Sequence, residues 1–157
     1  ILDDVAIPMG IAKQGYRVLF EPNAKAWDNF SEDAHEFRRK VRTLSGNYQL
    51  VQNAPWVLTP SNPLLFRFIS HKLLRLLVPF LLIVMLLTSA FLPGTFYRAA
   101  FVLQLAVYAL AAVALLRPRI NPLRRLTDVA YAFVSLNAAA LVAFFYFVSG
   151  KKGVWAR

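Results

Sequence analysis

The chain of 157 residues carries 18 Lys and Arg against 8 Asp and Glu, a net charge of +10, and 58% of its residues are hydrophobic. Soluble domains hold about 45–50% apolar residues, so this composition indicates a membrane protein. Cysteine is absent, which excludes disulfides and thiolate zinc sites. Residues 1–36 hold seven acids and three bases, whereas residues 37–157 hold fifteen bases and one acid, so two regions in different surroundings are expected.

The first 30 residues begin with the acid pair Asp3–Asp4 and without Met. We expect residue 1 not to be a natural start, and the chain to be the C-terminal piece of a larger protein. Apolar residues over 5–14, followed by Gly15, predict a short helix that the glycine caps. The stretch YRVLFEP, residues 16–22, alternates in part and predicts a strand. Together these elements make half of an α/β layer, which is too small to bury a core alone.

A basic amphipathic helix is predicted from Asp33, with Ser31 or Asp33 as its cap. Its apolar residues recur at helical spacing, at Phe37, Val41, Leu44, Tyr48 and Val51. The guanidinium groups of Arg38, Arg39 and Arg42 share a neighbouring face. Two interpretations stay open. The helix lies against anionic headgroups, or Arg39 and Arg42 hold a diphosphate, which suits the planar guanidinium fork; different faces of one helix can do both.

Three prolines in residues 53–63 predict an elbow, with Trp56 as an interfacial anchor. Three apolar segments follow, each close to the about 20 residues that cross about 30 Å of hydrocarbon; they are residues 73–92, 96–116 and 129–148. Pro79 is expected to kink the first segment. Gln104 and Asn137 are expected to bond between helices rather than to line a substrate path. No Asp, Glu or His lies within a segment, which argues against a proton-relay transporter.

The orientation follows from Lys and Arg beside the spans. Bases precede the first span and fill the loop RPRINPLRR after the second, whereas the hairpin between those two spans holds only Arg98. The acidic head and the RPRINPLRR loop are therefore expected on the cytoplasmic side. Three crossings would put the basic tail, residues 149–157, outside and against the rule. Either the rule is overridden there, or the last segment does not cross fully.

Two motifs resemble one enzyme family. The stretch DDVAIPMGIAKQGYRVLFEPNAKAW is similar to the end of the catalytic domain in membrane-bound family 2 glycosyltransferases, which include cellulose, chitin and hyaluronan synthases and bacterial exopolysaccharide enzymes. There an acidic pair precedes a helix and a Gly-Tyr-Arg-Val strand, and the second acid is the general base. The resemblance implies that Asp4 is the base and Asp3 a supporting acid. The family's Gln-x-x-Arg-Trp motif with a later Gly is matched at Arg42 and Gly46, whereas the Gln and Trp positions hold Arg39 and Thr43.

The resemblance also implies a domain order. Residues 1–30 would be an α/β remnant that ends a GT-A-like glycosyltransferase domain. Residues 31–71 would form interfacial amphipathic helices and the elbow, residues 72–148 about three transmembrane helices, and residues 149–157 a basic tail. Arg39, Arg42 and Thr43 would bind the substrate diphosphate or the acceptor.

The implied function is inverting transfer of a sugar from a nucleotide sugar to a growing glycan or a lipid-linked acceptor. The reaction would take place at the cytoplasmic face of a membrane, expected to be the bacterial inner membrane. A divalent metal, Mg²⁺ or Mn²⁺, is expected for the complete enzyme. Its ligands are not expected in this chain, because no Asp-x-Asp occurs in it, and the chain alone is expected to be inactive.

A competing hypothesis is a non-catalytic membrane protein whose basic helix binds anionic lipid or a partner. Surface acids that cap helices are commoner than catalytic ones, so the acid pair favours catalysis only through its spacing to the second motif. The basic pI, near 10.4, would suit nucleic acid, but most bases flank membrane spans, so no nucleic-acid partner is expected. His35 and His71 lie far apart without a third ligand, so no metal site is expected from this chain.

Overall fold

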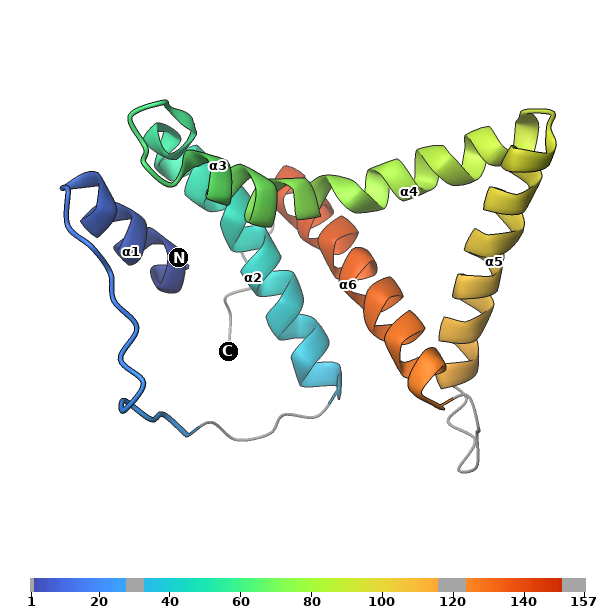
Figure 1. Ribbon diagram of the computed structural model, residues 1–157, viewed down its shortest axis with the longest axis horizontal. Coiled ribbons are helices and arrows are strands. Elements are labelled where there is room, and N and C mark those ends of the chain that lie inside the picture. Colours follow the sequence, from blue (N-terminus) through green and yellow to red (C-terminus); the bar gives the residue numbers. More distant parts are fainter. Residues whose placement is uncertain (1, 28–32, 116–123, 151–157) are drawn as a thin grey trace.

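The computed structural model describes residues 2–27, 33–115 and 124–150, and within these ranges the chain is helical and has no strand (Figure 1). The amphipathic helix α2 lies between α1 on one side and the apolar helices on the other (Figure 1). The helical elements in chain order are α1 (Asp3–Lys13), α2 (Asp33–Asn53), the 3-10 turn η1 (Pro55–Leu58), α3 (Leu65–Phe68), the π-helical turn η2 (Ile69–Leu73), α4 (Leu74–Phe91), α5 (Thr95–Leu115) and α6 (Arg124–Val148).

The short helix predicted over residues 5–14 is confirmed as α1, which begins two residues earlier, at Asp3. Gly15 follows the helix with a φ of 86°, a conformation that glycine adopts without a steric penalty, and its N–H donates to the Ala12 carbonyl at 3.0 Å. Because the helix begins early, Pro8 lies in its second turn. Proline has no N–H, so Pro8 leaves the Asp4 carbonyl without its usual donor four residues later.

The strand predicted over residues 16–22 is wrong. This segment belongs to no helix or ladder, and its side chains are exposed, Leu19 by 84% and Phe20 by 88%. A strand is stable only where a neighbouring strand supplies hydrogen-bond partners, and the described part of the chain supplies none. The described residues therefore hold no α/β layer, because the alternation in YRVLFEP reflects only a local preference.

The basic amphipathic helix is confirmed as α2. Most of its apolar stripe faces α6, whereas Val51 packs in the cluster that joins α2 to α1. Val41 and Leu44 are buried against three small residues of α6, which let the two backbones approach closely; these are Ala139, Ala140 and Ala143. The cap predicted at Ser31 lies outside the described residues. The stripe therefore serves packing against an apolar helix, while the arginines lie on the exposed side.

The elbow predicted over residues 53–63 contains η1 and a turn that a buried asparagine holds. The Asn62 Nδ2 donates to the Val57 carbonyl at 2.7 Å, and its Oδ1 accepts from the Leu64 N–H at 2.9 Å. From Leu65 to Phe91 the chain is one helical run, in which η2 is the π-helical turn. The elbow thus leads the chain from α2 into the first long apolar helix.

Three helices are long and apolar enough to cross a membrane: the run Leu65–Phe91, α5 and α6. The prediction that Gln104 bonds between helices is confirmed, because its Nε2 donates to the Leu82 carbonyl of α4 at 2.9 Å. The same prediction for Asn137 is wrong, since its Nδ2 donates to the Phe133 carbonyl of its own helix at 2.8 Å. A short amide can satisfy itself one turn back along its helix and needs no neighbour.

Candidate functional site

The N-terminal end of α1 rests on a glycine of α2. A Cβ built on Gly46 would lie 2.5 Å from Leu2 Cδ1 and 2.8 Å from Leu2 Cγ, so the Leu2 side chain keeps this position only against a glycine. Leu2 directly precedes the acid pair and has the left-handed φ of 47°. Its carbonyl accepts the N–H groups of Val5 and Ala6 at 2.9 and 2.8 Å, which starts the helix.

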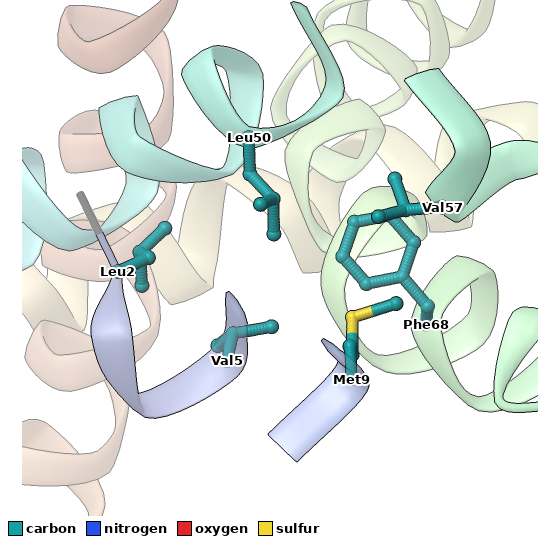
Figure 2. Packing of buried hydrophobic residues seen from close by; sticks show 6 residues of the cluster. All are labelled: Leu2, Val5, Met9, Leu50, Val57 and Phe68. Carbon is teal, nitrogen blue, oxygen red and sulfur yellow. The ribbon is translucent and has the colours of Figure 1, made fainter. Parts of the chain in front are cut away.

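The rest of α1 is anchored by an apolar cluster with the elbow and α3. Val5 and Met9 are buried and point toward Leu50, Val57 and Phe68, as Figure 2 shows. At the far end of α1, the Lys13 ammonium lies 4.5 Å from the centre of the Trp56 ring, a cation–π distance. The helix α1 is therefore held at its start by Gly46 of α2 and at its far end by Trp56 of the elbow.

The predicted diphosphate-binding residues lie on the face of α2 that leads to this contact. Arg39, Arg42 and Thr43 precede Gly46 by seven, four and three residues, and these spacings bring all four to one side of a helix. With a rise of 1.5 Å per residue, Thr43 lies about 4.5 Å, Arg42 about 6 Å and Arg39 about 10 Å below Gly46 along the axis. All three side chains are exposed.

Asp3 and Asp4 occupy the first turn of α1, and both are exposed. Carboxylates in a first turn are stabilised by the positive end of the helix dipole. Within the described residues, no hydrogen bond or ion pair engages the Asp4 carboxylate, so the group is accessible to a proton donor from solvent or substrate. Since α1 runs from Leu2 toward the C-terminal end of α2, the acid pair is at the end of α1 nearest to Arg42 and Thr43.

The contact of Leu2 with Gly46 thus places Asp3 and Asp4 beside the part of α2 that carries Arg42 and Thr43, and Arg39 lies one turn further from the acid pair. Sequence patterns did not single out Asn47, which is 98% buried in α2 and lies one turn beyond Thr43. Its Nδ2 donates to the Thr43 carbonyl at 3.2 Å, and no described residue donates to its Oδ1. A polar residue inside an otherwise apolar helix face is the only sequence signal that marks it.

The described residues include no group of three His, Asp or Glu side chains that would hold a metal ion. His71 in η2 pairs with its neighbour instead, its Nδ1 lying 2.7 Å from Ser70 Oγ. The Ser70 hydroxyl also donates to the Phe66 carbonyl at 2.8 Å. The chemistry that the described chain offers near Gly46 is therefore carboxylate and guanidinium chemistry.

Comparisons of the chain with models of protein families, with curated proteins and with solved structures find no match. The functional assignment therefore depends on the residues themselves and on the geometry around Gly46.

Proposed function

We propose that this chain supplies the general base and part of the diphosphate-binding surface of an inverting, membrane-bound family 2 glycosyltransferase, and that α1 ends its GT-A-like domain. The observation that carries the proposal is the contact of Leu2 with Gly46. Through this contact two motifs that are distant in the sequence share one surface, as a joint role in catalysis requires.

The proposed reaction assigns one step to each motif. The Asp4 carboxylate takes the proton of an acceptor hydroxyl while the hydroxyl oxygen forms a bond to the anomeric carbon of the donor sugar. The bond from that carbon to the diphosphate oxygen breaks, and its electron pair leaves with the nucleoside diphosphate. Arg42, with Arg39, stabilises the negative charge that develops on the diphosphate. Attack opposite the leaving group inverts the anomeric centre.

The divalent metal belongs to the proposal for the complete enzyme, and its ligands are expected outside this chain. The acid pair stands without a third acidic or imidazole ligand within the described residues, and two adjacent carboxylates do not make a metal site. The side chains of this chain therefore contribute a general base and positive charge, and the nucleotide sugar and the glycan acceptor bind as substrates.

The test is sugar transfer by the full-length protein in membranes, with a panel of radiolabelled uridine- and guanosine-diphosphate sugars and Asp4→Asn as the variant. Loss of the base is expected to lower transfer by at least about 100-fold, with membrane insertion unchanged. Glu36→Gln is the matched control, because Glu36 is a half-exposed acid of α2 that pairs with Lys40 at 3.0 Å, one turn along the same helix. Equal transfer by wild type and Asp4→Asn would refute the proposal.

The exposure of Arg38, Arg39 and Arg42 on α2 favours a second candidate, a non-catalytic protein that binds anionic lipid. This function predicts that replacing the three arginines with glutamine weakens binding to vesicles of anionic lipid, whereas Asp4→Asn leaves vesicle binding unchanged. The two variants together therefore separate the candidates.

A further inference from the structure

The helix α2 packs along the C-terminal half of α6 (Figure 1). The Ser45 hydroxyl lies 3.5 Å from the Ala143 carbonyl, and the rings of Tyr48 and Phe147 stack at 5.2 Å. The two helices run in the same direction, because the later residue of α2 contacts the later residue of α6. Consequently the segment of α6 around residues 139–147 shares its depth in the membrane with α2.

That depth must be a membrane surface, because α2 carries exposed charges. Arg38, Arg39 and Arg42 are all exposed on the side away from α6. A single arginine at the bilayer centre costs at least about 2.5 kcal/mol, so three exposed arginines on α2 strongly disfavour that depth. An α6 that crossed from its basic N-terminal end would carry its C-terminal half, and α2 with it, into the far leaflet.

The start of α4 gives an independent measure of the same depth. Leu76, in the first turn of α4, is buried in the cluster that joins α2 to α6. The rings of Phe80 and Phe144 are 5.1 Å apart. At 1.5 Å per residue, Phe80 lies only about 7.5 Å along α4 from Arg75, the base in the first turn of that helix. Phe144 is therefore close to the surface from which α4 enters the membrane.

The position of Phe144 is incompatible with an upright α6. Measured from Arg125, which the positive-inside rule assigns to the same surface as Arg75, Phe144 is about 28 Å along the axis of α6. A helix that descends about 7.5 Å over about 28 Å of its length is tilted about 75° from the membrane normal. Such a helix lies almost parallel to the membrane plane.

The arrangement of the three long helices agrees with this geometry. In Figure 1, α4 and α5 meet at the hairpin and diverge from it to opposite ends of α6, so that the three helices form a triangle. A hairpin that crosses twice has both of its open ends on one side of the membrane. The helix that joins those ends then lies along that surface, with both of its own ends on the same side.

We propose that α4 and α5 are the membrane crossings, and that α6 is a surface helix which binds the leaflet on the side of α2. The side chains of Phe133, Phe145 and Tyr146 are exposed on α6 and supply aromatic contacts to the acyl chains and headgroups. Lys151 and Lys152 of the tail then lie on the same side as the loop RPRINPLRR, and the conflict with the positive-inside rule disappears.

The absence of cysteine allows a direct test, because every introduced thiol is unique in this chain. The single variants Ser61→Cys in the elbow, Thr95→Cys in the hairpin and Ser149→Cys after α6 replace exposed residues. The full-length protein, with any cysteine outside this chain replaced by serine, is treated in intact cells with a membrane-impermeant maleimide before and after permeabilisation. Thr95→Cys is expected to react before permeabilisation, and Ser61→Cys only afterwards.

The decisive variant is Ser149→Cys. We expect it to react only after permeabilisation, as Ser61→Cys does. Reaction in intact cells, as for Thr95→Cys, would overturn the proposal. If a cysteine variant is poorly inserted, reporters fused after Arg157 give the same answer. A fluorescent protein that matures only in the cytoplasm is expected to be bright at this position. Alkaline phosphatase, which folds only outside the cytoplasm, is expected to be inactive there. The reverse pattern would show that α6 crosses the membrane.

Discussion

Replacing Gly46 with alanine tests whether the contact under Leu2 positions the acid pair. The new methyl group would lie 2.5 Å from Leu2 Cδ1 and 2.8 Å from Leu2 Cγ, whereas ordinary carbon contacts begin at 3.4 Å. Leu2 must therefore move by about 1 Å or leave its place. Because Asp3 and Asp4 follow Leu2 directly, the acid pair moves with it relative to Arg42.

The substitution has opposite effects on the two helices. Overpacking of this size costs about 1–3 kcal/mol, and this cost weakens the packing of α1 against α2. Alanine within α2 stabilises that helix by up to about 1 kcal/mol relative to glycine. Hydrogen exchange followed by mass spectrometry, on the full-length protein in lipid nanodiscs, separates the two effects. Exchange of the Val5 and Ala6 amides is expected to rise about 5- to 150-fold, while α2 exchanges no faster than in wild type.

Gly10→Ala is the matched control, because a Cβ at Gly10 meets nothing within 4 Å. This variant is expected to slow exchange in α1 slightly and to leave sugar transfer unchanged, whereas Gly46→Ala lowers transfer. Unchanged protection of α1 and unchanged transfer in Gly46→Ala would refute the argument that the Leu2 contact positions the acid pair.

Further predictions concern the anchors of α1 and α2. Lys13→Met removes the cation–π contact with Trp56, worth about 0.5–1 kcal/mol, and is expected to raise exchange in α1 about 2- to 5-fold, whereas Lys13→Arg keeps wild-type protection. Ala143→Leu overfills a fully buried position against α2 and is expected to destabilise the pair by about 1–3 kcal/mol, measured as faster exchange in α2. Burial raises the pKa of the Tyr48 phenol above its ordinary 10.0, so the stability that it contributes is present below pH 10.0 and is lost as the pH rises through the folded pKa. The difference in phenolate absorbance between wild type and Tyr48→Phe should therefore titrate with a pKa above 10.0. A difference spectrum that titrates at or below pH 10.0 would contradict the burial of this phenol.

The helices were predictable because their signals are local. Apolar residues at helical spacing identify α2, and length and composition alone identify the three long apolar helices. The strand at residues 16–22 failed because strand formation depends on a partner strand, which no local pattern reveals. The prediction for Asn137 was wrong for a similar reason, since the sequence does not show whether an amide bonds to its own helix or to a neighbouring helix.

The candidate site was predictable residue by residue but not as an assembly. Motif spacing pointed to Asp4 and Arg42, yet their common surface results from the fit of Leu2 against a glycine in α2. No sequence pattern predicts the contact of Leu2 with Gly46, because Leu2 is an ordinary apolar residue in the sequence. The packing of α2 on α6 was equally hidden, since a basic amphipathic helix before a span predicts a lipid contact as readily as a protein contact.

The most direct test of the central claim compares binding and transfer on one preparation of the full-length Asp4→Asn variant in membranes. If Asp4 is the base, nucleoside diphosphate binds as it does to wild type while sugar transfer falls by at least about 100-fold. Arg42→Ala provides the contrast, because it is expected to weaken nucleoside diphosphate binding itself. Transfer at the wild-type rate by Asp4→Asn, with its binding intact, would contradict the account.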